Sequence, residues 1–476
     1  MINTSALRSK ILVSAMHGQL SERLSSDSVV DALYEDIIEL KNGLIKSKAI
    51  RKDAKLEEII EPEYELPSEW KWVRFGKIIT LQSGQDLKSN EYNASNDGIP
   101  YMTGASNFND DGTLTINRWT ETPKSIAKCG DILISVKGTV GKVAVVFEEE
   151  VHIARQIMGI RTYKLNVDFV KYFVESEIER IKAASKGLIP GIERNDILNM
   201  SFPLPPIEEQ KRISDRITEA FHILETIDEL QAAYSSNLEV LKAKIIDAGI
   251  QGKLTERLPG DGNAEDLYAA IQEEKAKIYI ERKSRKNKKT KPIDDDTPFV
   301  IPEHWRWVRL GDVGLFKKGP FGSALTKSMF VPKTEQTVKV YEQQHAIKKD
   351  SSLGTYYITR EYFDERMSGF EVLPGDIIVS CAGTIGETYI MPDGIEQGII
   401  NQALMRITLP LGISKRFFQY YFDANLKKSA QEESNGSAIK NIPPFDVLKN
   451  WYFPLIPYEE QLRIVESIDA TLNVIK

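Results

Sequence analysis

FPLPPIEEQKRI at residues 202–213 and FPLIPYEEQLRI at residues 453–464 are two copies of one motif. In each copy an aromatic residue and prolines precede charged residues that alternate with isoleucine. Proline suits the entry turn and first position of a helix, and the pattern that follows suits a helix with one apolar face. The motif therefore predicts the end of a compact module that runs into a helix, twice in one chain.

Internal repetition extends over the whole chain of 476 residues. Three more pairs of segments match in the same order: 7–27 with 241–261, 66–78 with 301–313, and 130–146 with 375–391. The separation of matched residues grows along the chain, so insertions lie between the shared landmarks. The divergent stretches 83–112 and 317–350 are then expected to be loops on a rigid frame, where recognition usually resides.

The segment 206–254 relates the two chain ends to each other. Residues 457–476 match its first half, and residues 1–20 match its second half, apart from the part near 226–234. We therefore expect the two ends to come together and to form a second helix, antiparallel to the first.

The segment itself is predicted to be one long helix. Pro205 and Pro206 suit its start, and Gly249 and Gly252 suit its end. Its apolar residues recur at spacings of three and four, as in a coiled coil: Ile213, Ile217, Ala220, Leu224, Ile227, Leu230, Tyr234, Leu238, Leu241 and Ile245. Charged flanks favour an exposed strut over the alternative, a helix buried in a single globule.

The predicted fold class is α+β: two mixed α/β modules in a pseudo-twofold circular repeat, separated by two long antiparallel coiled-coil-like helices. Each module is expected to begin with a Trp-x-Trp-Val-Arg strand and to end in an aromatic-rich helix. The expected boundaries are 1–65 for an N-terminal helix and linker, 66–205 for the first module, 206–254 for the central helix, 255–300 for a helix and charged linker, 301–456 for the second module, and 457–476 for a C-terminal helix that pairs with the N-terminal one.

Composition excludes several classes of protein. The net charge of −7 argues against coating nucleic acid through bulk charge, so any such binding must use local patches. The two cysteines are far apart and suggest neither a disulfide framework nor a zinc site. No apolar run is long enough to span a bilayer and no signal peptide is evident, so we expect a cytoplasmic protein. The basic run at 282–291 is best interpreted as a solvated linker.

Several stretches imitate catalytic motifs without completing them. GTVGK at 138–142 lacks the first glycine and the hydroxyl of a phosphate-binding loop, and GTIGE at 383–387 lacks the lysine, so a β-turn explains both. NIPPF at 441–445 resembles the tetrapeptide with which amino-methyltransferases hold a base, but an isoleucine interrupts it. The five histidines show no metal-ligand spacing and no nucleophile partner. The sequence predicts no active site and no bound metal.

The repeated motifs together resemble a known family, the specificity subunits of type I restriction-modification enzymes. The resemblance rests on Pro-Leu-Pro-Pro-x-x-Glu-Gln at 203–210, its echo at 454–461, Gly-Lys-Leu-Thr at 252–255, and the doubled Trp-x-Trp-Val-Arg and Gly-Asp-Ile segments. It covers essentially the whole chain, including its circular organisation. Two departures are modest: GQLS at 18–21 replaces the commoner GKLT, and Tyr458 follows the proline of the second copy.

This resemblance implies two target-recognition domains that each read one half of a split DNA site. It also implies no catalysis and no cofactor in this chain. Two modification subunits would bring S-adenosylmethionine and adenine methylation, and restriction subunits would bring ATP-dependent cleavage with Mg, in defence against phage. A helix of about 44 residues is about 65 Å long, against about 34 Å for one turn of DNA, so its length would act as a ruler between half-sites.

The residues expected to contact DNA come from the divergent loops, because base edges favour Arg, Lys, Asn and Gln. In the first module they are Lys88, Asn90, Asn107, Lys137, Arg155, Gln156, Lys186 and Arg194. In the second they are Lys327, Gln343, Gln344, His345, Asn401, Gln402, Lys440 and Asn441. Gln156 and Gln402 match in sequence, which favours both slightly. The residues expected on partner-docking helices are Leu7, Ile11, Ile213, Ile217, Leu224, Leu238, Leu241, Ile245, Ile464 and Ile468.

Two other functions are compatible with the architecture or the composition. A two-headed protein scaffold without DNA specificity is mildly favoured by the acidic balance. A single-chain nuclease or methyltransferase would require an acidic cluster or a methyl-donor loop that the sequence lacks. The polar, asparagine-rich and lysine-rich divergent loops favour DNA.

Overall fold

The computed structural model describes residues 1–52, 55–59, 63–184, 191–281, 289–381, 384–433 and 442–475. The chain forms two compact units, Met1–Ala233 and Tyr234–Lys476. One helix, α6 (Ile207–Ile250), belongs to both units and confirms the long central helix predicted from the sequence.

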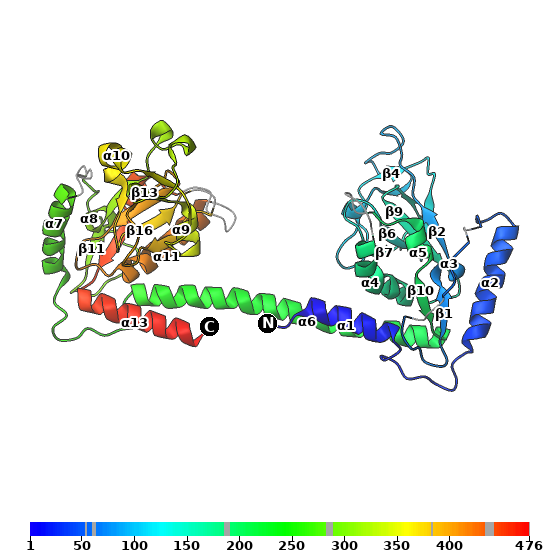
Figure 1. Ribbon diagram of the computed structural model, residues 1–476. Coiled ribbons are helices and arrows are strands. Elements are labelled where there is room, and N and C mark those ends of the chain that lie inside the picture. Colours follow the sequence, from blue (N-terminus) through cyan, green and yellow to red (C-terminus); the bar gives the residue numbers. More distant parts are fainter. Residues whose placement is uncertain are drawn as a thin grey trace. The chain divides into compact units, whose positions relative to one another are not determined.

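Unit 1 combines short strands with helices at both ends of its sequence (Figure 1). Its helices and helical turn are α1 (Thr4–Met16), α2 (Val30–Lys46), α3 (Phe75–Ile78), η1 (Ala105–Asn107), α4 (Val167–Ala184) and α5 (Arg194–Leu198). Its strands are β1 (Lys71–Arg74), β2 (Ile79–Ser83), β3 (Ile99–Met102), β4 (Trp119–Thr120), β5 (Ile126–Lys128), β6 (Ile132–Ser135), β7 (Val143–Val145), β8 (Glu150–Ile153), β9 (Ile157–Thr162) and β10 (Ser201–Leu204).

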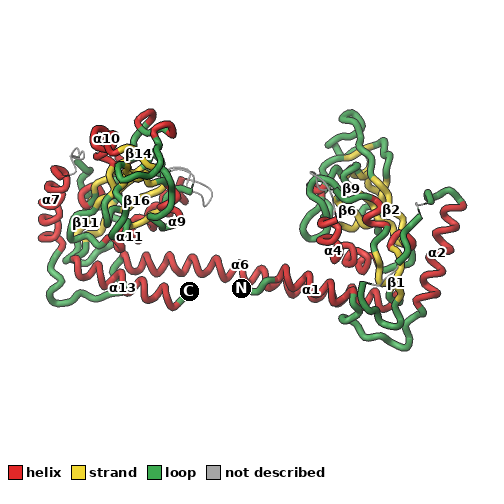
Figure 2. Tube along the Cα trace, viewed as in Figure 1, coloured by secondary structure: helices red, strands yellow, loops and turns green. Residues whose placement is uncertain are grey.

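Unit 2 follows the same plan, with loops around short strands (Figure 2). Its helices and helical turns are α7 (Ala264–Glu281), α8 (Leu310–Val313), η2 (Gly322–Ala324), η3 (Lys327–Met329), α9 (Gln343–Lys348), α10 (Arg360–Tyr362), η4 (Phe363–Met367), η5 (Ser368–Phe370), α11 (Lys415–Glu433), α12 (Phe445–Leu448) and α13 (Tyr458–Val474). Its strands are β11 (Arg306–Arg309), β12 (Leu315–Lys318), β13 (Thr337–Tyr341), β14 (Tyr357–Thr359), β15 (Glu371–Val372), β16 (Ile377–Ser380), β17 (Thr388–Ile390), β18 (Gly398–Ile400), β19 (Leu404–Thr408) and β20 (Tyr452–Leu455).

The two units share one sheet topology. Unit 1 has sheets ordered β2-β9-β6-β7, β4-β3-β8-β5 and β1-β10, and unit 2 has β12-β19-β16-β17, β14-β13-β18-β15 and β11-β20. Each unit also places its one parallel pair at the same point, β3 with β8 and β13 with β18. This strand-by-strand correspondence confirms the duplicated α+β fold predicted from the repeats.

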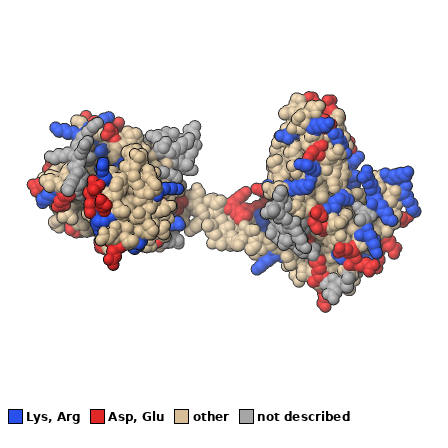
Figure 3. Space-filling view, turned by 45° about the horizontal axis from the view of Figure 1, so that its top comes forward, with Lys and Arg blue, Asp and Glu red and all other residues tan. Residues whose placement is uncertain are grey.

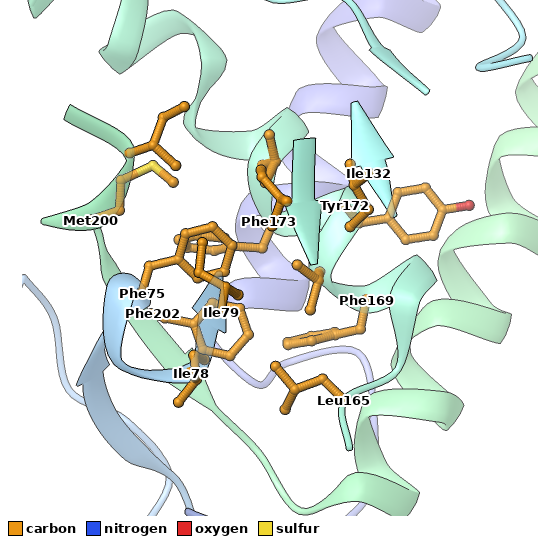
Figure 4. Close-up of a cluster of buried hydrophobic side chains, with 14 of the residues drawn as sticks. Phe75, Ile78, Ile79, Ile132, Leu165, Phe169, Tyr172, Phe173, Met200 and Phe202 are labelled. Carbon is orange, nitrogen blue, oxygen red and sulfur yellow. The ribbon is translucent and has the colours of Figure 1, made fainter. Parts of the chain in front are cut away.

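The core of unit 1 lies between its sheets and the aromatic helix α4. Phe173 meets Phe202 edge to face at 4.7 Å between ring centroids, and Phe75 stacks on Phe202 at 5.4 Å (Figure 4). All three rings are fully buried or nearly so. In unit 2, Tyr421 and Phe453 occupy the corresponding place and meet edge to face with their centroids 5.1 Å apart. The aromatic-rich helix predicted to close each module thus packs in the core of that module.

Each copy of the opening motif attaches the start of its helix, α6 or α13, to the strands of its own unit. Glu209 accepts a hydrogen bond from the indole Nε1 of Trp70 at 2.8 Å, and Glu460 accepts one from Trp305 at 3.0 Å. The two carboxylates are almost completely buried. The motif's Glu and the Trp-x-Trp strand are therefore two halves of one contact, which occurs once in each unit.

The next residue of the motif links the start of the same helix to the start of the aromatic helix. The side chain of Gln461 donates to the carbonyl of Ile456 at 2.7 Å and accepts from the N–H of Ser414 at 2.8 Å. Gln210 makes the equivalent bonds in unit 1, to the Pro205 carbonyl at 2.9 Å and from the Asn166 N–H at 3.0 Å. Each glutamine therefore joins the backbone just before its own helix to the backbone just before the aromatic helix, α4 or α11.

The arginine of the motif holds the segment that follows the antiparallel partner of its helix. This segment comes after α1 in unit 1 and after α6 in unit 2. Arg212 donates through two nitrogens to Asp27, at 2.9 and 2.6 Å, and Arg463 donates in the same way to Asp261, at 2.8 and 2.7 Å. These hydrogen bonds hold the pKa of each aspartate below its ordinary value. Bidentate geometry makes them stronger than ordinary surface pairs.

Each terminal helix packs antiparallel to the part of α6 in its own unit. In unit 1 the N–H of Ile2, before α1, donates to Gln231. At the other end of α1 the Leu20 carbonyl accepts from Arg216, which lies earlier on α6, so the two helices run in opposite directions. Figure 1 shows α1 along α6. In unit 2, a Cβ placed on Gly249 would lie 2.5 Å from the Ile468 side chain, so α13 packs closely on the last turn of α6. The expectation that the two chain ends adjoin stays a prediction.

Glycine ends the helix at equivalent places in the two units. Gly18 and Gly252 have φ values of +67° and +71°, in the left-handed region. A side chain at Gly252 would also lie 2.6 Å from the Trp305 ring. Gly252 is therefore the terminator expected from the sequence, while Gly249 lies inside the last turn.

A partly buried carboxyl group occupies the same place in both aromatic helices. Asp423 on α11 accepts hydrogen bonds from the Thr388 hydroxyl at 2.9 and 3.0 Å, and burial raises its pKa from 3.8 to about 6. In unit 1, burial likewise raises the pKa of Glu175, three residues after Tyr172 as Asp423 is three after Tyr420. Each module therefore keeps a carboxyl group that burial disfavours in its charged form.

Replacing Asp423 by asparagine is expected to stabilise the protein at pH 8 but not at pH 4. The pKa of the Asp423 carboxyl is higher in the folded state than in the unfolded state, so the folded state binds this proton more tightly. The stabilisation from the bound proton is lost as the pH rises from 3.8 to about 6. Asparagine avoids the burial of charge, and we expect a gain of about 1–3 kcal/mol at pH 8. Urea unfolding at both pH values measures it. Exposed Asp364→Asn is the control, and an equal shift at both pH values would contradict the assignment.

Candidate nucleic-acid interface

In unit 1 the strand ends bring several loops to one edge. Antiparallel pairing places Ser83, at the end of β2, opposite Met158, and Ser135, at the end of β6, opposite Ile157. Parallel β3 and β8 end together, because Met102 pairs with Ile153. The segments that leave these strands therefore gather beside one another. We call this set loop edge 1: residues 84–90, 103–109, 136–142 and 154–156.

Unit 2 repeats the arrangement with different side chains. Lys318 at the end of β12 pairs with Met405, Ser380 at the end of β16 pairs with Leu404, and β13 ends beside β18. The resulting loop edge 2 consists of residues 319–325, 342–348, 384–387 and 401–403. The first two segments of each edge lie in the divergent stretches 83–112 and 317–350, as expected for recognition loops on a shared frame. The third segment of each edge, 136–142 or 384–387, belongs to the matched segments 130–146 and 375–391.

A glycine allows the backbone to cross closely at each edge. A Cβ placed on Gly84 would lie 2.0 Å from the carbonyl oxygen of Ala154, and one placed on Gly319 would lie 1.8 Å from that of Asn401. Both distances are far below van der Waals contact. Only glycine fits at these two positions, where the first and last loops of each edge touch.

Most candidates of the first module lie on loop edge 1 or next to it. Lys88, Asn90, Lys137 and Arg155 are exposed there, and Gln156 is half-buried. Arg194 lies beside the edge, where Nη1 donates to the Leu81 carbonyl at 2.8 Å. The structure thus brings together residues that are up to 68 positions apart in sequence, from Lys88 to Gln156.

Asn107 is a correction to the predicted set. It is fully buried, its Oδ1 accepts from the N–H of Thr103 at 2.8 Å, and its Nδ2 donates to the Thr115 carbonyl at 2.9 Å. Its amide holds a loop of the edge in shape and has no face left for a base.

The candidates of the second module also include residues on the loop edge and a residue that is buried. Asn401 and Gln402 lie on loop edge 2, as do Gln343 and Gln344 on α9, while Lys327 is exposed on the neighbouring turn η3. Asn401 is half-buried and its Oδ1 accepts from the Ala403 N–H at 3.0 Å.

His345 is a second correction. It is fully buried, with Nδ1 2.9 Å from the Glu342 carbonyl oxygen and Nε2 2.6 Å from that of Leu353. The imidazole therefore ties α9 to the loop after it. Lys186, Lys440 and Asn441 lie outside the described residues.

The register of the strands also corrects the match between Gln156 and Gln402. Val136 donates its N–H to the carbonyl of Gln156 at 2.8 Å, and the equivalent Cys381 donates to that of Ala403 at 2.8 Å. Gln156 therefore corresponds to Ala403, and Gln402 corresponds to the residue before Gln156. Matching the glutamines by sequence is wrong by one position.

Half of the residues assigned to partner-docking helices are buried in their own unit: Ile213, Ile217, Leu224, Ile464 and Ile468. They pack in the cores and cannot meet a partner in this structure. Ile11, Leu238 and Ile245 are half-buried, and Leu7 and Leu241 are exposed. Further exposed apolar residues of α6 are Ile223, Leu230, Tyr234 and Val240. The apolar repeat predicted along α6 therefore contains both buried residues, such as Ile213, and exposed ones, such as Leu230 and Tyr234, and the sequence did not separate the two faces.

A basic hollow beside β2 was missed by sequence reasoning. Its volume is about 840 Å³. The charged residues that line it are Arg51, Lys52, Lys124, Arg161, Glu193 and Arg194. Two of the five cations are paired with carboxylates outside the hollow, Lys124 with Glu91 and Arg161 with Asp131. The other cations, which include the exposed Arg51 and Lys52, suit phosphate groups. The charged lining residues are scattered over the sequence from 51 to 194, and only Arg194 among them was predicted from the sequence to contact DNA.

The motifs that imitate a phosphate loop are turns held by a serine. The Oγ of Ser135 donates to the Thr139 carbonyl at 2.8 Å and accepts from the Lys142 N–H at 2.9 Å. Ser380 holds the second copy through its contact with the Glu387 N–H at 2.9 Å. Among the described residues, no group of three or more His, Cys, Asp or Glu side chains could hold a metal ion. A search of the described helices found none with the length and apolarity to cross a membrane.

Charge on the visible surface is mixed rather than of one sign. Figure 3 shows Lys and Arg side chains interspersed with Asp and Glu on both units. Local patches must therefore carry any attraction for an anionic partner, in agreement with the net charge of −7.

One frame built twice, with different polar loops at the same edge of each copy, defines a two-module recognition protein. The chain matches the family model for the type I restriction modification DNA specificity domain over residues 67–232 and again over residues 302–476. It belongs to this family. Specificity subunits of the family are non-catalytic, so the chain supplies DNA sequence specificity rather than chemistry.

Known relatives agree with this assignment over nearly the full length. The specificity subunits of the type I restriction enzymes EcoAI and EcoEI, both from Escherichia coli, are 23% and 22% identical to the chain. The alignments cover 98% of this chain in both cases, and 88% and 89% of the relatives. A solved chain from a study of complex assembly and conformational transition in a type I R-M system matches the fold with a TM-score of 0.57, at 18% identity, over 87% of this chain and 92% of the other.

Proposed function

We propose that the chain reads a bipartite, asymmetric DNA target, with loop edge 1 on one half-site and loop edge 2 on the other. The observation that carries the proposal is the pairing of one sheet topology with two different sets of edge residues. Equal frames present their loops in equal geometry, so differences in side chains become differences in the bases that are preferred. The basic hollow beside β2 would serve the phosphates next to the first half-site.

The proposed partners follow from the same assignment. Two modification subunits would dock on the chain, one for each repeat, because a duplicated frame offers two similar surfaces. Restriction subunits would join through them. S-adenosylmethionine, ATP and Mg would bind to these partners, with no cofactor in this chain. The role of α6 in setting the spacer between half-sites is part of this proposal.

Exchanging residues 66–205 for the corresponding module of another family member is expected to change only one half of the methylated motif. Loop edge 1 lies entirely inside the exchanged part, and loop edge 2 lies outside it. Long-read sequencing of host DNA, with the chain and its modification partners present, maps the methylated adenines. The matched control exchanges residues 301–456, which should change the other half. If either exchange altered both halves or neither, the modular reading would be refuted.

A two-headed protein scaffold is the alternative, favoured by the acidic net charge and by the exposed apolar residues of α6. Gel shifts with random duplexes, with and without the modification partner, separate the two. A scaffold should shift no duplex under either condition.

A further inference from the structure

Arg155 on loop edge 1 is exposed but already oriented. Its side chain is 68% accessible, and its Nε lies 2.7 Å from the Oδ2 of Asp86. The other oxygen of Asp86 accepts the backbone N–H of Arg155 at 3.1 Å. Within the described part of the chain the two terminal nitrogens, Nη1 and Nη2, have no other partner. The guanidinium therefore keeps its end-on pair of donors available to a ligand.

The backbone fixes both members of this pair. Gly84 donates its N–H to the Ile157 carbonyl at 3.1 Å, and Gln85 donates to the Ile153 carbonyl at 2.9 Å. These bonds attach the segment that carries Asp86 to both sides of the short connection that carries Arg155. The carboxylate is thus held where it can restrict the rotamers of the arginine, which lowers the entropy lost on binding.

Gln402 occupies the position of Arg155 in the second unit. Asn401 donates to the Tyr341 carbonyl at 3.0 Å, as Ala154 donates to that of Met102 at 2.9 Å. The next residue on each chain is therefore equivalent: Gln402 in one unit and Arg155 in the other.

Gln402 is also exposed, and among the described residues no hydrogen bond joins its side chain to a carboxylate. Gly319 donates to the Leu404 carbonyl at 3.0 Å, as Gly84 does to that of Ile157, so the residue two positions later is the counterpart of Asp86. That residue is Phe321, which is exposed. One position on a common frame therefore carries a buttressed cation in unit 1 and a neutral amide in unit 2.

The two side chains differ in the base that they recognise. Arginine matches the O6 and N7 acceptors of guanine with two parallel hydrogen bonds, whereas glutamine matches the N6 donor and N7 acceptor of adenine. We propose that Arg155 reads a guanine in the half-site of unit 1, that Gln402 reads an adenine at the corresponding place in the half-site of unit 2, and that Asp86 is a positioning residue for Arg155. This inference rests on the proposed function and adds the identity of one base pair in each half-site.

Reciprocal variants test the assignment in the full chain with its modification partners. Arg155→Gln should move the preference at one position of the methylated motif from guanine towards adenine, and Gln402→Arg should do the opposite in the other half. Affinity for a duplex with the wild-type motif should fall about 5- to 150-fold for Arg155→Gln, the range of one bidentate base contact. All other positions of the motif should stay unchanged.

Asp86→Asn separates positioning from contact. It should weaken binding to the wild-type motif several-fold while the preference for guanine is retained, because the guanidinium remains but is less restrained. A shift in base preference with this variant would show that Asp86 itself contacts a base and would overturn the positioning role.

Arg118→Gln is the matched control. Arg118 is also an exposed arginine of unit 1, but it lies over the ring of Tyr92 at 5.0 Å, outside loop edge 1. It should leave the motif unchanged. If the wild-type chain shows no sequence preference, both the proposed function and this inference fail. If it has a motif that neither Arg155→Gln nor Gln402→Arg alters, this inference alone is overturned.

Discussion

Gly319→Ala is expected to abolish sequence-specific recognition by unit 2, with a loss of more than about 150-fold in affinity for the target, above the range of one bidentate base contact. The added methyl would lie 1.8 Å from the Asn401 carbonyl oxygen and 2.5 Å from its carbon. Backbone atoms cannot rotate away as side chains can, so the two crossing segments must separate. Gln402, the residue after Asn401, moves with them.

Gly84→Ala should have the same effect on unit 1, because its methyl would lie 2.0 Å from the Ala154 carbonyl oxygen, next to Arg155. Fluorescence anisotropy with target and scrambled duplexes distinguishes loss of specificity from loss of all binding. Circular dichroism of each variant tests the fold.

The controls for these variants are glycines with free space around them. Gly43 in α2 and Gly369 in η5 have no neighbouring atom within 4 Å of an added methyl and no left-handed φ. Gly43→Ala should even stabilise α2 slightly, since alanine is the better helix former by roughly 1 kcal/mol. Normal specificity in Gly84→Ala and Gly319→Ala would show that the edges tolerate separation, and the recognition role of these loops would then be in doubt.

The frame was predictable from sequence because it is written twice. Repeated landmarks such as the Trp-x-Trp strand and the Glu-Gln motif located the modules, and apolar periodicity located α6. What repetition could not supply was the reason for the landmarks. The contact between Trp70 and Glu209 joins residues 139 positions apart, and no local pattern links them.

Exposure within loops was the main source of error. Asn107 and His345 have side chains that suit a base edge, yet both are consumed by the loops that contain them. A polar residue in a loop either contacts ligand or satisfies the loop's own backbone, and sequence alone does not distinguish the two. Buried Lys41 and Lys275 illustrate the same limit, because each donates to carbonyl groups in or just after a short helix that lies more than 30 positions away in sequence.

The register of the second edge failed for a different reason. A sequence alignment matches identical residues, and so it matched Gln156 with Gln402. In the structure, equivalent positions are defined by their hydrogen bonds to neighbouring strands. These hydrogen bonds make Ala403 of unit 2 the equivalent of Gln156 of unit 1. The most informative comparison, Arg155 with Gln402, joins unlike residues and was therefore invisible until the strands were paired.

Glu460→Ala should be among the most destabilising single substitutions in the chain. Its carboxylate is 3% exposed and lies 3.0 Å from Trp305 Nε1 and 2.9 Å from His304 Nε2. Removing it leaves buried polar groups without an acceptor and opens a cavity at the start of α13, for a cost of about 2–4 kcal/mol. Urea unfolding followed by tryptophan fluorescence measures it.

Two further variants separate the hydrogen bond from the charge and from the helix. Glu460→Gln keeps one acceptor oxygen for Trp305 and should recover part of the loss, whereas Glu459→Ala, at the exposed neighbouring position, should cost little. Glu209→Ala tests the first copy, where the carboxylate accepts from Trp70 and from the Ser21 hydroxyl at 2.7 Å. Because the two contacts share no residue, their costs should add. A near-neutral Glu460→Ala would mean that burial of the tryptophan ring alone fastens the helix, and that the repeated glutamate is retained for another purpose.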